Sequence, residues 1–180
     1  LLLNLPAVLY AGNIDVKQSV WNGHVRYDFT FDGSHATIVC PDSVISGKPW
    51  IWRPAFFGAF PSVDKALLKK GFHVVFYDMT HRYGSPQAVE QGRKFYDYLL
   101  SAWHFSPKVT LEGFSRGGYY ALNWAIANPD KVACLYLDNP VCDMFSWPGE
   151  KSKLWNDFLK EWGMTSVDKD NFKGNPLDNL

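Results

Sequence analysis

The residues best suited to chemistry form the run Gly113-Phe114-Ser115-Arg116-Gly117-Gly118, which matches the pattern G-x-S-x-G. An apolar segment precedes this run, and a helix-forming segment from Gly117 to Ala127 follows it. A serine at a sharp strand-to-helix turn has a strained backbone that exposes its hydroxyl, and bulky residues two positions away would collide. Gly113 and Gly117 meet that requirement. The pattern predicts Ser115 as a nucleophile that attacks a carbonyl carbon.

Such an attack produces an oxyanion, which needs hydrogen-bond donors. The backbone N–H of Arg116 is one candidate, because it would lie at a helix N-terminus. A second donor normally comes from the loop after an earlier strand, here Arg53-Pro54-Ala55-Phe56-Phe57-Gly58. Pro54 has no N–H, so Ala55 or Phe56 is the candidate. Two alternatives stay open: Ser115 only caps a helix, and the aromatic loop only packs over the sheet edge.

Other chemistries fit less well. The pattern G-x-G-x-x-G is absent and no Lys-Ser/Thr pair follows the glycines, so a dinucleotide or P-loop site is disfavoured. The 18 basic and 18 acidic residues balance, which argues against a nucleic-acid partner. Three cysteines without metal-ligand spacing predict neither a disulfide framework nor a metal site. We therefore expect a chemistry that needs no cofactor.

The first half of the chain must place these residues. Partial alternation over 25–31, the turn Asp32-Gly33 and an apolar segment over 35–40 predict an antiparallel hairpin. A short strand at 49–52 ends at Arg53-Pro54. A helix with Ser62 as its N-cap then extends to Leu68, and the apolar run 72–78 predicts a parallel strand covered on both faces.

The second half continues the alternation of strands and helices. Ser85-Pro86 begins a helix that ends near Trp103, and strands are expected at 108–112 and 132–137 on either side of the 117–127 helix. An amphipathic helix over 153–162 follows. The predicted fold class is α/β, with a mainly parallel sheet preceded by an antiparallel N-terminal hairpin.

This order of elements, together with the Gly113 to Gly118 run, resembles the α/β-hydrolase fold over roughly residues 24–140. Within that superfamily, three further segments resemble bacterial secreted or periplasmic hydrolases of the prolyl-oligopeptidase-like and esterase groups: 50–58, 83–86 and 143–149. The resemblance implies an acyl hydrolase with a small-molecule ester substrate, which could be carbohydrate-linked. It does not fix the acyl group.

The resemblance also implies an acid and then a histidine after the nucleophile. All the histidines lie before Ser115, at 24, 35, 73, 81 and 104. His81 could contact the substrate or pack in its loop, and Asp138 ends a predicted strand where some members keep their acid. In the resembling group the segment 175–180 precedes the strand that carries the acid. We therefore expect a C-terminally truncated fold, inactive by itself.

The chain begins with an apolar run, Leu1 to Gly12, that is too short to span a bilayer. It could be the remnant of a secretory signal peptide or an ordinary apolar segment. The corresponding division is an N-terminal segment at 1–15 and a partial hydrolase domain at 16–180. A secreted or periplasmic location is expected in the first case and a cytoplasmic one otherwise.

Three hypotheses about function follow. The first is a serine hydrolase acting on a carboxylic ester, and the second is a serine peptidase of prolyl-oligopeptidase type. The third is a non-catalytic hydrolase-like module or an inactive fragment, for which the missing downstream histidine argues. Trp147, Trp155 and Trp162 either enclose a ligand in a cap or pack on the sheet edge.

Overall fold

The computed structural model describes residues 15–179. The predicted signal-peptide remnant at 1–15 lies outside these residues, apart from Asp15. Within the described part, a central sheet has the strand order β1-β2-β3-β5-β4-β6-β7. The strands are β1 (Lys17–Trp21), β2 (His24–Phe31), β3 (Ser34–Val39), β4 (Trp50–Arg53), β5 (His73–Tyr77), β6 (Val109–Phe114) and β7 (Val132–Asp138).

The sheet has a parallel half and an antiparallel half. Strands β5, β4, β6 and β7 pair in parallel, whereas β1, β2 and β3 pair antiparallel with one another and β3 pairs antiparallel with β5. The predicted hairpin is therefore confirmed and extended by β1, which the sequence did not indicate. The predicted α/β class is confirmed, with a mixed sheet.

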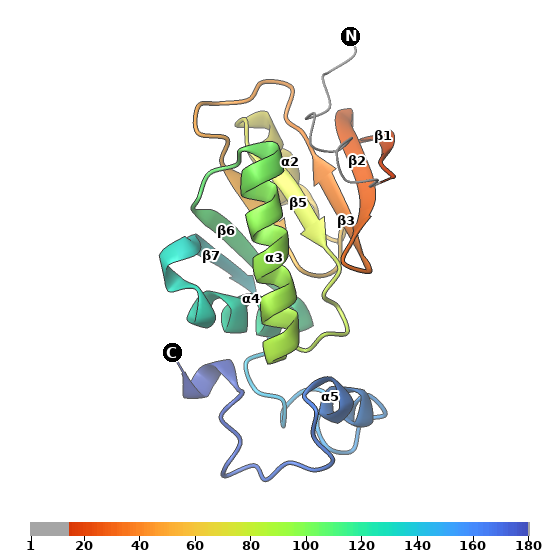
Figure 1. The fold of residues 1–180 in the computed structure, drawn as a ribbon, viewed down its shortest axis with the longest axis vertical. Coiled ribbons are helices and arrows are strands. Elements are labelled where there is room, and N and C mark those ends of the chain that lie inside the picture. The colour runs from red at the N-terminus through yellow and green to blue at the C-terminus, as the bar shows by residue number, and fades with distance from the viewer. Residues whose placement is uncertain (1–14, 180) are drawn as a thin grey trace.

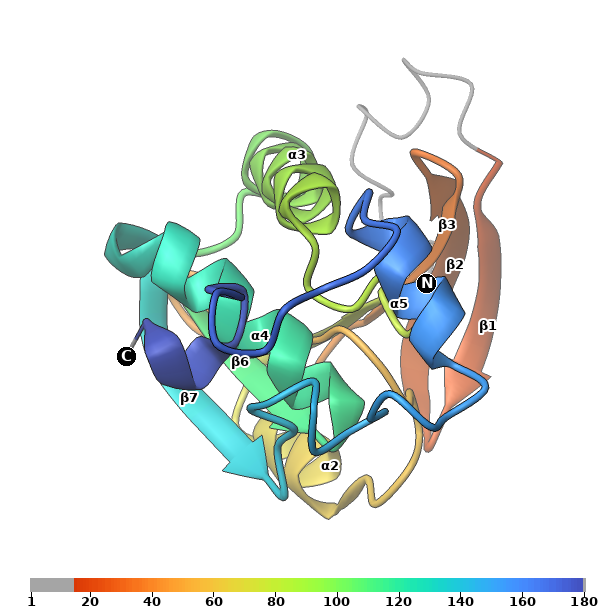
Figure 2. The ribbon, with the colours of Figure 1, turned by 90° about the horizontal axis from the view of Figure 1, so that it is seen from below.

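Helices cover both faces of the sheet. The helix α3 (Pro86–Trp103) packs with α4 (Arg116–Ala127) on one face, and α2 (Ser62–Lys69) packs against the other (Figures 1 and 2). Ser85 accepts a hydrogen bond from the N–H of Ala88, as its predicted N-cap role requires. Ser62 is instead the first helical residue after Pro61, and no side chain caps α2.

The main core lies between the sheet and the two helices α3 and α4. It is rich in aromatic rings because large flat side chains fill the space between layers at low entropic cost. Trp52 of β4 is fully buried, and its ring contacts Phe95 of α3 and both Tyr120 and Trp124 of α4. Ile51, the preceding residue of β4, faces the other side of the sheet. It belongs to a smaller core under α2. The strand β4 is thus buried on both faces of the sheet.

Residues 141–179 form what we call the cap segment, which lies beyond the carboxyl ends of the parallel strands (Figure 1). It contains α5 (Trp155–Glu161) and a short 3-10 helix, Pro176–Asp178; another, Pro129–Lys131, precedes β7. The cap segment has its own apolar cluster, in which Trp155 and Trp162 pack with Phe158 and Phe172. All three tryptophans, Trp147 included, therefore pack in this cluster, to which Tyr83 and Tyr119 also belong.

Several hydrogen bonds fasten the cap segment to the rest of the protein. Glu161 accepts hydrogen bonds from Arg82 Nε at 2.6 Å and Ser85 Oγ at 3.0 Å. Trp162 Nε1 donates to the carbonyl of Tyr83 at 2.9 Å. Tyr119 of α4 donates to the carbonyl of Gly174 at 2.8 Å. The cap segment is therefore held mainly by the loop before α3 and by α4.

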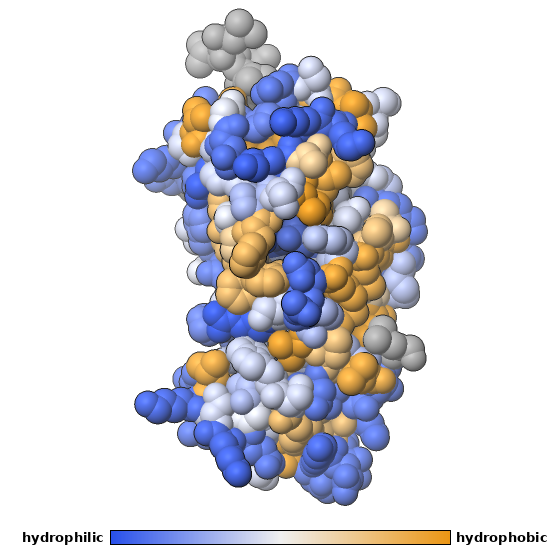
Figure 3. Space-filling model, turned by 180° about the vertical axis from the view of Figure 1, so that it is seen from behind, coloured by the Kyte–Doolittle hydropathy of each residue, from blue (hydrophilic) through white to orange (hydrophobic). Residues whose placement is uncertain are grey.

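The last strand in the order, β7, leaves apolar side chains in contact with water. Leu135, Tyr136 and Leu137 are each more than one third exposed. Apolar side chains also gather in patches on the face opposite α3, as the space-filling view shows (Figure 3). Among the helices of residues 15–179, none combines the length and apolar character needed to cross a membrane.

Candidate active site

Ser115 occupies the sharp turn between β6 and α4. Its backbone has φ 52° and ψ −127°, a left-handed conformation that costs an L-residue about 1–3 kcal/mol. Three hydrogen bonds hold it there: the Ser115 N–H donates to the Asp138 carbonyl, and its carbonyl accepts from Gly118 and Val141. These bonds are 2.9–3.1 Å long. The strained conformation is therefore stabilised by β7 and by the chain that follows it.

The glycines around Ser115 leave no room for a side chain. A Cβ on Gly113 would lie 2.7 Å from Leu137 Cδ2 and 2.8 Å from Gly118 Cα. The sequence analysis did not single out Gly118, yet a Cβ there would lie 2.4 Å from Pro140 Cβ. A Cβ on Gly117 would lie 3.1 Å from Ala55 Cβ. The three glycines thus allow β6, β7 and the loop after β4 to approach the turn closely.

The loop after β4 lies against the first turn of α4. Ala55 is buried, and its nitrogen is 3.7 Å from the Cβ position of Gly117. In residues 15–179, the backbone N–H groups of Ala55, Phe56 and Arg116 have no hydrogen-bond acceptor. N–H groups that are free beside a strained serine, one of them at a helix N-terminus, suit the binding of an oxyanion.

A buried charged cluster fixes the beginning of this loop. Arg53 of β4 lies between Asp64 of α2, with which it forms an ion pair, and Glu112 of β6, whose Oε1 is 3.2 Å from Arg53 Nη2. Arg53 Nη2 also donates to the carbonyl of Ala59 at 2.9 Å. This cluster was not predicted from the sequence, although a charged residue inside each of two apolar strands was a usable signal.

The side chain of Arg116 lies beside two aromatic rings. Its Cζ is 5.1 Å from the ring centre of Phe56 and 5.9 Å from that of Trp147. The ring of Trp147 is 6.4 Å from that of Tyr83. Phe56, Tyr83 and Ser115 all have positive φ values, of 56°, 44° and 52°. Six other non-glycine residues of the described chain also have positive φ, so it is the position of Ser115 at the strand-to-helix turn that marks this region.

Among the described residues, no hydrogen bond joins a histidine side chain to Ser115. His24 bonds Asp42 at 3.0 Å and His35 bonds Thr37 at 3.2 Å. Burial lowers the pKa of His73 to about 4, and this residue begins β5, at the opposite end of the parallel strands from Ser115. His104 is the C-cap of α3 and His81 is exposed.

Asp138, the candidate acid, ends β7 opposite Phe114 of β6. Its backbone carbonyl accepts the hydrogen bond from Ser115 described above. No ion pair or hydrogen bond joins its carboxylate to a histidine in residues 15–179. In the structure, Asp138 therefore supports the turn through its backbone carbonyl. Its place in a triad stays a prediction.

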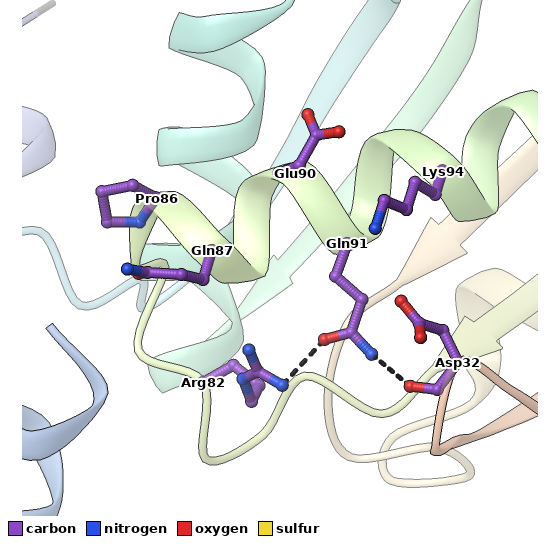
Figure 4. A pocket seen from close by; sticks show the side chains of 7 residues that line it. All are labelled: Asp32, Arg82, Pro86, Gln87, Glu90, Gln91 and Lys94. Carbon is purple, nitrogen blue, oxygen red and sulfur yellow. Dashed lines mark hydrogen bonds between the residues drawn. The ribbon is translucent and has the colours of Figure 1, made fainter. Parts of the chain in front are cut away.

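One hollow lies away from Ser115, beside the beginning of α3. It has a volume of about 600 Å³. Gln91 in its wall accepts a hydrogen bond from Arg82 and donates one to the backbone carbonyl of Asp32 (Figure 4). Its charged lining residues are Asp32, Arg82, Glu90 and Lys94. These charges balance, and Arg82 and Glu90 already have ion-pair partners. Within residues 15–179, no group of His, Cys, Asp or Glu side chains could hold a metal ion.

A parallel half-sheet covered by helices, with a strained serine between a strand and a helix, defines the α/β-hydrolase class of proteins. The sequence model of the family described as alpha/beta hydrolase fold matches residues 52–179. The chain belongs to this family. A comparison with curated protein sequences found no match.

Solved structures agree on the fold. A cold-adapted esterase from an Arctic intertidal metagenomic library is 16% identical, with a TM-score of 0.53 over 67% of this chain and 61% of that one. A Bacteroides ovatus protein provisionally assigned as a dipeptidyl aminopeptidase IV is 16% identical, with a TM-score of 0.56 over 93% of this chain and 26% of that one. The chain thus spans less than two thirds of either protein's length.

Proposed function

We propose that the protein is a cofactor-independent serine hydrolase that acts on carboxylic esters. The observation that carries the proposal is the geometry at Ser115: a left-handed backbone at the strand-to-helix turn, with unpaired N–H groups on Arg116 and on Ala55 or Phe56. Membership of the α/β-hydrolase family and the fold shared with an esterase support it. The same fold in a protein assigned as an aminopeptidase keeps peptide hydrolysis as the second candidate.

In the proposed reaction, Ser115 Oγ attacks the ester carbonyl carbon while its proton passes to a general base. The N–H groups of Arg116 and of Ala55 or Phe56 stabilise the oxyanion of the tetrahedral intermediate. The C–O bond to the alcohol breaks, and the alcohol leaves with the proton from the base. Water then attacks the acyl-enzyme, which releases the acid and restores Ser115 with its proton.

We further propose that the base and its acid come from a segment outside these 180 residues, because every histidine of the chain precedes Ser115. By this proposal the 180-residue chain alone is inactive towards activated esters such as p-nitrophenyl acetate. Loss of the triad leaves only a small residual acceleration. Turnover by the 180-residue chain that depends on Ser115 would contradict this part of the proposal.

The direct test is covalent labelling. Protein expressed from its complete gene is treated with a fluorophosphonate, and the modified peptide is identified by mass spectrometry. We expect the adduct on Ser115 and no adduct in the Ser115→Ala variant. The matched control is Ser101→Ala, which removes an exposed helical serine and should label as the wild type does. Labelling elsewhere, with Ser115 unmodified, would refute the proposed nucleophile.

A further inference from the structure

The side chain of Arg116 has no carboxylate partner among residues 15–179. No ion pair there includes it, and its Nε is buried without a hydrogen-bond acceptor. The guanidinium instead lies over the rings of Phe56 and Trp147. Aromatic faces hold a guanidinium in place but leave its N–H groups unpaired. The residue next to the proposed nucleophile therefore presents a charged donor that needs an acceptor.

A second unpaired donor lies nearby. The Tyr83 side chain is 4% exposed, and its hydroxyl has no hydrogen-bond partner in the described part of the chain. Trp147 contacts both Tyr83 and Arg116, which places the two donors around one indole ring. Burial raises the pKa of Tyr83, and the charges of Asp157 and Arg116 act on it in opposite directions. The hydroxyl is therefore protonated, and able to donate, at neutral pH.

Leaving such groups unpaired is costly. A buried donor without an acceptor destabilises the folded protein by about 1–3 kcal/mol, and by more when the donor is charged. The acids close to Tyr83, Asp157 and Glu161, do not remove this cost, because neither accepts a hydrogen bond from its hydroxyl. The two donors come from α4 and from the loop before α3; Arg116 follows the strained Ser115, and Tyr83 itself has a positive φ. Such an arrangement suits a ligand that brings its own acceptor.

We propose that Arg116 and Tyr83 bind a carboxylate of the substrate, so that the preferred esters are anionic. The inference rests on the proposed function, since it names the class of ester that Ser115 would cleave. A guanidinium stacked on rings offers its planar edge, which matches a planar carboxylate through two parallel hydrogen bonds. The site has one arginine, and the acids Asp157 and Glu161 lie in the vicinity. These charges favour a ligand with a single negative charge over a phosphate dianion.

The first test compares ester pairs that differ in one charge. On the acyl side the pair is p-nitrophenyl hydrogen glutarate and its methyl ester, and on the alcohol side it is p-acetoxybenzoate and its methyl ester. We expect the wild type to prefer the anionic member of at least one pair. In Arg116→Gln the ratio of the two kcat/KM values should fall about tenfold or more, and in Tyr83→Phe it should fall less.

The matched control is Arg93→Gln, because Arg93 is an exposed arginine of α3 with surface ion pairs to Glu90 and Asp97. Its ratio should equal that of the wild type. If Arg116→Gln does not fold, Arg116→Lys serves instead, since it keeps the charge and loses the planar fork. A ratio that stays unchanged in the Arg116 variant would overturn the inference while leaving Ser115 hydrolysis intact.

The second test does not need catalysis. Binding of monomethyl glutarate to Ser115→Ala protein is measured by titration calorimetry, with dimethyl glutarate as the neutral comparison. We expect only the anion to bind, and its affinity to fall about tenfold or more when Arg116→Gln is added. Equal binding with and without Arg116 would refute the carboxylate site. Absence of Ser115-dependent hydrolysis together with Arg116-dependent binding would instead refute the proposed function alone.

Discussion

Arg53 Nη2 and Glu112 Oε1 lie 3.2 Å apart in a region almost closed to water, where the two residues are 1% and 5% exposed. Arg53 begins the loop that carries Ala55 and Phe56, and Glu112 comes three residues before Ser115. This contact thus connects the strand of the proposed nucleophile to the loop of the second proposed oxyanion donor.

The Glu112 carboxyl should make stability depend on pH. Burial, and secondly the charge of Asp64, raise the pKa of Glu112 from 4.5 to about 8. Asp64 Oδ1 and Glu112 Oε2 have no other partner, so a proton on Glu112 can join them. Between pH 4.5 and about 8 the folded protein holds a proton that the unfolded chain has released. The free energy of unfolding should therefore fall as pH rises in this window, by up to about 1.4 kcal/mol per pH unit.

Urea unfolding across that window gives the slope. Glu112→Gln should flatten it, because the amide keeps a donor for Asp64 at every pH. Glu90→Gln, on the exposed side of α3, should leave the slope as in the wild type. A variant at Glu112 with the wild-type slope would show that another group titrates.

Arg53→Met should destabilise the protein strongly. The methionine removes the cation between Asp64 and Glu112 and leaves buried acid without a counter-charge, at a cost of about 3–5 kcal/mol. Arg93→Met removes an arginine from exposed ion pairs and should change stability little. Denaturant midpoints of the two variants provide the comparison, and similar midpoints would contradict the structural role of the cluster.

Gly117→Ala should separate activity from stability. The added methyl would lie 3.1 Å from Ala55 Cβ, so the loop must move by a few tenths of an ångström. Alanine favours the helix by about 1 kcal/mol relative to glycine, so the fold should not suffer. Misplacing one oxyanion donor costs about 100-fold in rate. We expect fluorophosphonate labelling at Ser115 to slow markedly while the melting temperature holds or rises; equal losses in both would argue against the donor role.

Gly92→Ala should destabilise the core through a single contact. Its Cβ would lie 1.9 Å from the hydroxyl oxygen of Tyr120, so the fully packed interface of α3 and α4 must shift, at about 1–3 kcal/mol. Tyr120→Phe removes that oxygen together with its 3.2 Å hydrogen bond to Ala88. In a double-mutant cycle the second substitution should recover part of the loss. If the changes in unfolding free energy of the two substitutions simply add, the clash is with Trp52 instead.

Much of the fold could be predicted because apolar periodicity reports burial directly. The run 72–78 became the fully buried β5, and Ser85-Pro86 began α3 as expected. The strand β1 gave no such signal, since none of its residues is buried. Its place depends on pairing with β2, which is a tertiary contact.

The turn at Ser115 could be predicted because its glycines are a local requirement. The surroundings could not. Asp64 looks like an ordinary acid in the first turn of a helix until Arg53 is found beside it. Tyr83 and Trp147 are 64 residues apart along the chain, and only the folded protein shows that they meet at Arg116. Residue types alone do not show which residues distant in the sequence are in contact.

The left-handed backbone at Ser115 has a consequence for protein engineering. Glycine adopts that conformation without penalty, and Ser115 has only a small side chain to lose, so Ser115→Gly would relieve about 1 kcal/mol or more of strain. A variant library sorted only for heat resistance should therefore collect glycine at the position of the proposed nucleophile. Stabilisation of this protein needs an activity screen at every round, because the substitution that relieves the strain also removes the hydroxyl.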